Sequence, residues 1–384
     1  MEKIKMGIIG AGFIGPAHVE AVRRLGYVDV IALSELNQDL ADQKATQLSI
    51  SKAYSDYHAL LENKEVQVIH NCTPNFQHFE VIKAAIENGN HIISEKPLTL
   101  TADHSAKLVK MAKEARVINA VNFCYRHYPL VQQVKAMVSN GDIGRVYTVH
   151  GSYLQDWLLY ERDYNWRLDP QIGGTSRAIA DIGSHWCDTV QFATSLRITE
   201  VMADLMTVLP IRKKPKRTSV TFASNELHQD EYEEKHITTE DYGSVLFSLE
   251  NGAKGVFTVS QVSAGRKNRL YFEIDGATKA VAWNQEHPNY LWIGQRDRPN
   301  QYLMKDSSLL YPSAQNFTDY PGGHNEAYPD ILKMFLRNVY SFIINQKDPC
   351  RDQPNFPTFK DGHDEVLITE AILESNATRK WVTI

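Results

Sequence analysis

In the first third of the chain, short apolar runs alternate with segments whose apolar residues recur at helical spacing. The pattern predicts strands at 4–9, 28–33, 66–70, 91–94 and 117–120, and helices at 38–48, 57–61, 76–87 and 102–115. Repeated strand–helix units form a parallel sheet that is covered by helices on both faces. We therefore expect a Rossmann domain over residues 1–124.

The remainder of the chain shows a different pattern, in which alternation with a period of two residues dominates. A helix at 131–138 and a strand at 145–150 are followed by predicted strands at 243–249, 253–262, 269–274, 280–283 and 291–294, and by helices at 327–344 and 364–379. Alternating strands joined by tight turns form antiparallel sheets. The expected fold class is therefore an α/β Rossmann domain plus an α+β domain, residues 125–384, with a large, mostly antiparallel sheet.

Two features of this second sheet can be anticipated. Helices of the same chain should cover one face, which leaves the other for a partner subunit, so we expect a homodimer or homotetramer formed through the antiparallel sheet. The basic run 212–217 lies between strands and is expected to be a solvated loop. The polar stretch 218–239 is expected to be an excursion from the sheet, and its role stays open.

Composition and charge narrow the classes of function. The 384 residues are 43% hydrophobic and 23% charged, as in a soluble globular protein, and their length suggests two domains. The net charge of -5 argues against a nucleic-acid or anionic-membrane partner. No apolar run reaches the ~18 residues of a membrane span, and the first strand leaves no room for a signal peptide. Four scattered cysteines without a C-x-x-C pair indicate a reducing, cytoplasmic environment.

A glycine-rich turn follows the first strand and directly precedes a helical pattern. In this G-x-G-x-x-G sequence, Gly10 permits the tight turn, Gly12 lets the backbone approach a pyrophosphate, and Gly15 lets the helix pack close to the strand. The helix N-terminus offers unpaired N–H groups to phosphates. Glu35 follows 20 residues after Gly15, at the end of the second strand, where a carboxylate can bind both ribose hydroxyls of an adenosine. The turn and the acid together predict a dinucleotide site.

Ligands of parallel sheets bind at the carboxyl ends of the strands, and three polar segments fall there. These are 72–75 with His78 one turn later, 95–97, and 122–126. Lys96 stands out because Pro97 biases it to an extended conformation. A lysine at this position can stabilise a developing alkoxide or relay a proton, and an ordinary surface lysine is the competing interpretation.

A second candidate cluster lies in the downstream domain. Asp181, His185 and Asp188 are spaced four and three residues apart, which places them on one side of a helix. His185 is a candidate general base with a carboxylate to orient it. Asp181 could instead cap the helix, and D-x-x-x-H could be part of a metal site. No third ligand is apparent, so no metal is expected.

These landmarks, in this order, resemble the glucose–fructose oxidoreductase/inositol dehydrogenase (Gfo/Idh/MocA) family over the whole chain. The motifs that support the resemblance are the glycine turn, Thr73-Pro74-Asn75 with His78, Glu95-Lys96-Pro97, Trp166-Arg167 before Gly173-Gly174, Asp181-x-Gly183-x-His185, and the closing Phe356-Pro357-Thr358 to Asp361-Gly362 with Glu370-Ala371-Ile372. The aromatic stretch 153–158 followed by 165–167 is most similar to the branch that contains levoglucosan dehydrogenase.

The resemblance implies roles for individual residues. The implied catalytic residues are Lys96, Asp181 and His185. The implied cofactor contacts are Gly10, Gly12, Phe13, Ile14, Gly15, Ser34, Glu35, Thr73, Pro74, Asn75, His78, Glu95, Lys96, Asn122, Trp166 and Arg167. The implied substrate contacts are Lys96, Tyr125, Tyr153, Gln155, Asp156, Trp157, Asp181 and His185. Family members often have a basic residue at the position that Leu36 occupies here. The leucine side chain has no charge to bind a 2′-phosphate, so NAD is favoured over NADP.

The expected function is an NAD-dependent dehydrogenase that oxidises a secondary hydroxyl of a cyclic sugar, a sugar derivative or an inositol-like polyol. Two alternatives stay open. One is a glycosidase that holds NAD and oxidises the sugar only transiently. The other is a non-enzymatic regulator that binds a dinucleotide, because a fold alone does not fix a function.

Overall fold

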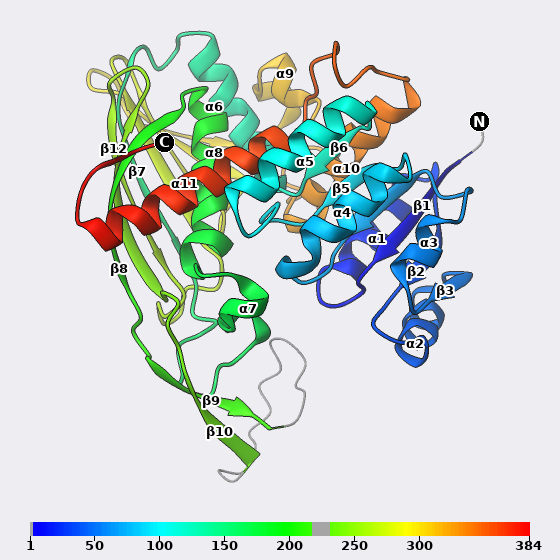
Figure 1. Ribbon diagram of the computed structural model, residues 1–384. Helices are drawn as coiled ribbons and strands as arrows, with labels where there is room; N and C mark the ends of the chain where they lie inside the picture. The colour runs from blue at the N-terminus through cyan, green and yellow to red at the C-terminus, as the bar shows by residue number, and fades with distance from the viewer. Residues whose placement is uncertain (1–2, 217–230) are drawn as a thin grey trace. The chain divides into compact units, whose positions relative to one another are not determined.

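The computed structural model describes residues 3–216 and 231–384, which group into two compact units (Figure 1). Unit 1 consists of Met1–Cys124 and Tyr328–Val366, and unit 2 of Tyr125–Ala327 and Leu367–Ile384. The segment 328–366 follows the second sheet in sequence, yet it packs with the N-terminal strands and helices. Its helix α10 (Tyr328–Ile344) lies on α1 (Gly15–Arg23), where Arg24 Nη2 donates to Asp330 Oδ1 at 2.6 Å.

Unit 1 is built on a six-stranded sheet in which every neighbouring pair is parallel. The strand order is β3-β2-β1-β4-β5-β6. The strands are β1 (Ile4–Ile9), β2 (Val28–Ser34), β3 (Lys52–Tyr54), β4 (Val68–Asn71), β5 (His91–Ser94) and β6 (Asn119–Val121). The connecting helices are α2 (Gln38–Leu48), α3 (Tyr57–Leu61), η1 (Asn75–Gln77), α4 (His78–Glu87) and α5 (Ala102–Ala115). The Rossmann-type sheet predicted from the alternating pattern is thus confirmed.

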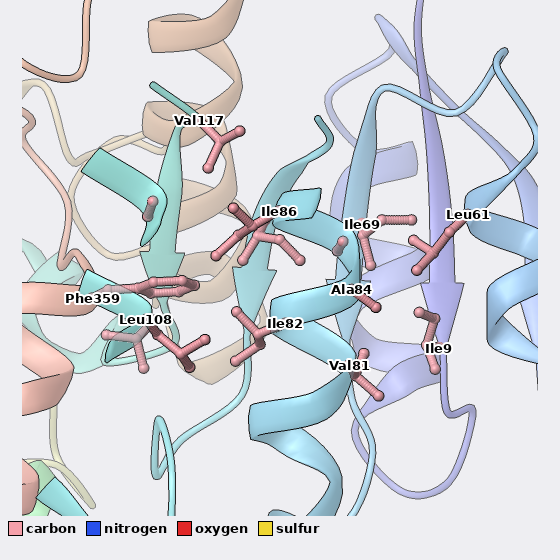
Figure 2. Close-up of a cluster of buried hydrophobic side chains, with 14 of the residues drawn as sticks. Ile9, Leu61, Ile69, Val81, Ile82, Ala84, Ile86, Leu108, Val117 and Phe359 are labelled. Atoms are coloured by element: carbon pink, nitrogen blue, oxygen red, sulfur yellow. The ribbon is translucent and has the colours of Figure 1, made fainter. Parts of the chain in front are cut away.

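The core of unit 1 forms where helix α4 lies against the sheet (Figure 2). Ile82 and Ile86 of α4 and Ile69 of β4 are buried in one cluster. Phe359, from the C-terminal helix α11 (Phe359–Thr378), fills the same cluster beside Leu108. Burying such side chains contributes about 1.5–3 kcal/mol each, so the C-terminal segment stabilises the Rossmann sheet.

Unit 2 contains a nine-stranded sheet in the order β16-β15-β14-β13-β7-β12-β11-β8-β17. Its strands are β7 (Val146–Leu154), β8 (Ile198–Met206), β11 (Tyr242–Leu249), β12 (Lys254–Ser260), β13 (Arg269–Gly276), β14 (Ala280–Asn284), β15 (Tyr290–Gly294), β16 (Gln301–Met304) and β17 (Val382–Thr383). Neighbouring pairs are antiparallel except β7 with β12, which run parallel. The predicted large, mostly antiparallel sheet is confirmed.

Helices α6 (Pro129–Ser139) and α8 (Ser184–Thr194) lie against one face of this sheet (Figure 1). Trp186 of α8 stacks on Phe257 of β12 with ring centroids 4.6 Å apart. The alternate positions of the same strands face away from the helices, and there Leu246 and Val256 pair across the ladder while staying 48% and 39% exposed. The remaining short helices of unit 2 are η2 (Cys124–His127), η3 (Trp166–Leu168), α7 (Pro170–Gly173), η4 (Ile179–Gly183), η6 (Ser307–Leu309) and α9 (Pro312–Gln315).

Over residues 212–215 the basic run is a strand and not a solvated loop, so that expectation was wrong; residue 217 lies outside the described part of the chain. Residues Ile211–Pro215 form strand β9, which pairs with β10 (Tyr232–His236). Arg212 is fully buried, and its guanidinium donates to the carbonyls of Leu158 and Tyr160 and to Asp241 Oδ1, each at 2.9 Å. These acceptors come from distant segments, so a charge run alone did not reveal them. Of the polar excursion 218–239, residues 218–230 lie outside the described part of the chain.

Candidate functional site

In the glycine turn after β1, the surroundings of each glycine show whether the fold itself requires glycine at that position. Gly10 has φ +87°, and a Cβ there would meet the carbonyl oxygen of Cys72 at 2.7 Å. A Cβ on Gly15 would meet the carbonyl oxygen of Gly10 at 2.5 Å. A Cβ on Gly12 would meet nothing within 4 Å. Gly12 therefore leaves space beside the backbone that a pyrophosphate needs, and no side chain caps the N-terminus of α1 that follows.

Glu35 lies directly beside this turn. Its Oε1 accepts a hydrogen bond from the Ala11 N–H at 2.5 Å, and its Oε2 accepts one from the Leu36 N–H at 3.3 Å. Ser34, at the end of β2, is buried, whereas Phe13 and Leu36 are exposed. The carboxylate expected to hold an adenosine ribose and the turn expected to hold the phosphates are thus adjacent, which fits a dinucleotide.

His78 joins two loops at the carboxyl ends of β4 and β5. Its Nδ1 lies 2.7 Å from the Pro97 carbonyl oxygen and its Nε2 lies 3.0 Å from the Thr73 carbonyl oxygen. Burial lowers the pKa of His78, while these two carbonyls and Glu95 oppose the shift. Thr73 is held in turn by a bond from its Oγ1 to Asn71 Oδ1 at 2.7 Å. His78 thereby fixes the loop with Thr73, Pro74 and Asn75 to the loop that carries Lys96.

Glu95 and Asn122 form a buried polar pair at the ends of β5 and β6. Asn122 Nδ2 donates to Glu95 Oε1 at 2.5 Å. Burial by itself raises the pKa of Glu95, but His18, Asn122 and Lys96 together lower it to about 2. The carboxylate is therefore ionised at neutral pH. Asn122 Oδ1 is buried and accepts no hydrogen bond from the described residues, so it is available to a donor on a ligand.

In unit 2, the segment that carries Asp181 is a π-helical turn, η4, which continues as helix α8. Glu240 caps its start by accepting hydrogen bonds from Ser176 Oγ, Arg177 N and Ile179 N at 2.7–2.9 Å. Burial raises the pKa of Glu240, and these three bonds oppose the shift. π-helical turns are rare and often mark functional sites. The regular helix predicted around Asp181 thus begins with an irregular turn.

Asp181 and Asp188 have separate arginine partners. Asp181 Oδ2 accepts from Arg177 Nη1 at 2.7 Å and from Gln261 Nε2 at 3.0 Å. The buried Asp188 accepts from Arg126 Nε at 3.0 and 2.9 Å through its two oxygens. Neither arginine was anticipated as a partner of these acids. Arg126 is 62 residues from Asp188, so no local pattern signals that contact. Arg177 stands four residues before Asp181, a spacing that does signal the pair and was overlooked.

Gln261 extends the contacts of Asp181 into a set of hydroxyl and amide groups, which we call the unit 2 polar network: Tyr125, Tyr153, Gln155, Asp181, Gln261 and Asn268. Asn268 Oδ1 accepts from Tyr153 at 2.7 Å and from Gln155 at 2.8 Å, and the hydroxyls of Tyr125 and Tyr153 lie 2.7 Å apart. Burial, followed by Tyr125, raises the pKa of Tyr153 well above its usual value, so it stays a neutral hydroxyl.

His185 joins this group through a ring contact, because it stacks on Tyr125 with centroids 4.7 Å apart. The structure therefore brings together five of the predicted substrate-site residues: Tyr125, Tyr153, Gln155, Asp181 and His185. Sequence reasoning missed Gln261 and Asn268. Gln261 directly follows β12, and Asn268 directly precedes β13; their places at strand ends were the one available signal.

The other predicted unit 2 residues lie in the loop 155–169. Asp156 Oδ2 accepts from Lys267 Nζ at 2.6 Å and from Gly265 N at 3.2 Å. The guanidinium of Arg167 lies over the ring of Trp166, 4.4 Å from its centroid. Trp157 is partly buried in the same loop. Lys96, by contrast, belongs to unit 1.

The described residues include one group of side chains that could hold a metal ion. Among residues 3–216 and 231–384, a group of three potential metal ligands within 4.8 Å of one another occurs at His150, Glu273 and Asp275, on strands β7 and β13. Asp181 and His185 are not part of it.

Comparison with known families agrees with this arrangement. Residues 4–123 match the family described as an oxidoreductase family with an NAD-binding Rossmann fold, and residues 131–282 match the GFO/IDH/MocA C-terminal domain. Unit 1 thus contains an NAD-binding Rossmann domain of an oxidoreductase. The chain belongs to the GFO/IDH/MocA family.

Relatives cover the whole length of the chain. Levoglucosan dehydrogenase of Pseudarthrobacter phenanthrenivorans is 28% identical over 400 residues, which is 100% of this chain and 99% of the relative. The myo-inositol 2-dehydrogenase of Thermotoga maritima is 29% identical over 88% of this chain and 89% of its own length. A solved structure of levoglucosan dehydrogenase with NADH and L-sorbose has a TM-score of 0.89, with 26% identity over 100% of this chain and 99% of that one. An oxidoreductase domain protein from Kribbella flavida has a TM-score of 0.89 and 30% identity over the full length of both chains.

Among the described residues, no helix is both long and apolar enough to span a membrane.

Proposed function

We propose that this protein is an NAD-dependent dehydrogenase that oxidises a secondary hydroxyl of a cyclic sugar, a sugar derivative or an inositol-like polyol. The observation that supports this most is the unit 2 polar network, which places hydroxyl and amide groups beside Asp181 and His185. Such groups match the hydroxyl surface of a carbohydrate, and the aromatic rings suit its apolar surface. Relatives named as levoglucosan and inositol dehydrogenases support the same substrate class.

In this proposal, three residues act on the reacting hydroxyl. His185 takes its proton as a general base. Lys96 stabilises the negative charge that develops on the oxygen. Asp181, held by Arg177 and Gln261, positions the pair. NAD⁺, when bound, supplies the hydride acceptor.

The preference for NAD over NADP is also a proposal. A 2′-phosphate on the adenosine ribose would bring negative charge to the Glu35 carboxylate, which repels it. The exposed Leu36 has no charge to compensate. The other proposed contacts to the cofactor are Phe13, Ile14, Ser34, the loop Thr73–Asn75, His78, Glu95, Asn122, Trp166 and Arg167. Within the described residues, none of the four cysteines forms a disulfide, which supports a reducing compartment such as the cytoplasm.

The test is a panel of monosaccharides, anhydrosugars, sugar phosphates and inositols offered with NAD⁺ or NADP⁺, with the absorbance of the reduced nicotinamide as readout. A matched control is His185→Asn, which should bind NADH and fail to turn over. Net reduction of free NAD⁺ by one sugar or polyol class supports the proposal. Bond cleavage in a glycoside without net reduction would instead indicate an NAD-dependent glycosidase. Dinucleotide binding with no turnover on any member would indicate a regulator.

A further inference from the structure

A chain of buried polar side chains leads to Glu95 from the C-terminal segment of unit 1. The Tyr340 hydroxyl of α10 lies 2.9 Å from His70 Nε2, and His70 Nδ1 lies 2.8 Å from His18 Nδ1. His18 Nε2 lies 2.9 Å from Glu95 Oε1. The side chain of His18 has no exposed surface, whereas that of Glu95 is 12% exposed. The carboxylate is thus the end of the chain that a ligand can reach.

With Glu95 ionised, the direction of the last hydrogen bond does not depend on how the protons of the two imidazoles are arranged. If both imidazoles are neutral, Tyr340 donates to His70, His70 donates to His18, and His18 Nε2–H donates to Glu95. If His18 is charged, it donates through both ring nitrogens, and His70 donates to Tyr340. In each arrangement, His18 donates to the ionised Glu95 carboxylate, because an ionised carboxylate can only accept. Burial, assisted by His18, holds the pKa of His70 well below its usual value.

The topology of the sheet indicates what Glu95 faces when a dinucleotide is bound. The glycine turn follows β1, Glu35 follows β2 on one side of it, and Glu95 follows β5 on the other side, beyond β4. A dinucleotide lies across the carboxyl ends of such strands, with its pyrophosphate at the glycine turn. With the adenosine ribose at Glu35, the nicotinamide half extends over β4 and β5. The two carboxylates are thus placed at opposite halves of one cofactor.

We propose that Glu95, held by the His18–His70–Tyr340 chain, makes the site bind the oxidised nicotinamide in preference to the reduced one. This inference rests on the proposed NAD-dependent function. The oxidised ring carries a positive charge and the reduced ring is neutral, so a nearby anion attracts one and not the other. Asn122, which donates to the same carboxylate oxygen, helps to fix the anion in place. The same charge stabilises bound NAD⁺ relative to bound NADH, so it opposes reduction of the bound ring and favours release of NADH.

The experiment compares dissociation constants for the two redox forms. NADH binding is followed by its fluorescence and NAD⁺ binding by displacement of NADH, so no turnover is needed. In Glu95→Gln, the ratio Kd(NADH)/Kd(NAD⁺) should fall by about tenfold or more, since one unit of charge near the ring is lost. Glu95→Asp keeps the charge and should change the ratio by less than about threefold. A fall in Glu95→Asp as large as that in Glu95→Gln would overturn the charge argument.

Glu35→Gln is the matched control, because the adenosine half is the same in both redox forms. It should weaken NAD⁺ and NADH by the same factor and leave the ratio unchanged. If Glu35→Gln weakens both forms while Glu95→Gln leaves the ratio unchanged, the inference on Glu95 fails and the NAD site stands. If neither redox form binds to the wild-type protein, the proposed function itself fails.

The role of His18 is tested through Glu95. His18→Leu removes the donor, so the buried carboxylate takes up a proton or turns away, and the ratio should fall as in Glu95→Gln. In the Glu95→Gln background, His18→Leu should not change the ratio further, because it acts through the missing charge. His18→Leu also substitutes for Glu95→Gln should the latter not fold. A uniform loss of affinity for both forms with a lower melting temperature would show that His18 is only structural.

Discussion

Replacing Arg177 by methionine removes the guanidinium that pairs with Asp181 and leaves that carboxylate with a weaker set of partners. Arg177 is only 2% exposed and Asp181 17%, so the pair is largely shielded from water. Removing one partner of a fully buried pair costs about 3–5 kcal/mol of unfolding free energy. Because Asp181 keeps some contact with water and a hydrogen bond from Gln261, we expect a smaller cost of about 2–3 kcal/mol.

The assay combines stability with kinetics. For a unit of this size, each kcal/mol lowers the melting temperature by roughly 2–4 °C, so Arg177→Met should melt about 5–10 °C earlier. A less firmly held Asp181 should lower kcat by about tenfold to hundredfold, as an error in the position of a catalytic group does. The Kd for NADH should stay unchanged, because Arg177 is not among the proposed cofactor contacts.

Two further variants isolate the ion pair. Arg177→Lys keeps the charge and should recover part of the loss in kcat. The double variant Arg177→Met with Asp181→Asn removes the uncompensated charge and should be more stable than Arg177→Met alone. An Arg177→Met protein with wild-type melting temperature and kcat would refute the role given to this pair.

The remaining predictions concern the cofactor, the base, assembly and acid stability. Glu35→Ser should reduce or reverse the preference for NAD over NADP in kcat/KM, and equal use of both by the wild type would contradict the assignment. His185→Asn and Lys96→Met should each lose about 10²–10⁴-fold in kcat while still binding NADH. The activity of the wild type should rise with pH, because the base must be neutral. A near-normal kcat in His185→Asn would end this mechanism. We propose that the sheet face carrying Leu246 and Val256 is buried between subunits, so light scattering at micromolar concentration should give at least a dimer, and a monomer would refute it. The pKa of Glu95 is about 2 against an ordinary 4.5. Its ionised form therefore stabilises the fold above pH 4.5, and this stabilisation is lost as the pH falls towards 2. Over that pH range, the denaturant midpoint should fall less in Glu95→Gln than in the wild type.

The sequence by itself determined the class of both sheets and the local motifs. Helix boundaries such as Gln38–Leu48 and Ala102–Ala115 could be predicted because caps and apolar spacing act within a few residues. The glycine turn and Glu35 could be predicted because their function depends on a fixed spacing after one strand. Period-two alternation likewise indicated the strands of the second sheet, although not that β7 and β12 run parallel.

Tertiary structure alone decided which polar groups meet. Arg212 looked like part of a solvated charge run, yet two segments that are distant in sequence, 158–163 and Asp241, supply its acceptors, and it is fully buried. Asp181 and Gln261 are 80 residues apart, and His70 and Tyr340 are 270 apart, so no local pattern connects them. Local spacing sets the conformation of a helix or a turn. The partners of a buried charge depend on how the whole chain packs, because a charge removed from water is satisfied by whichever groups the fold brings to it.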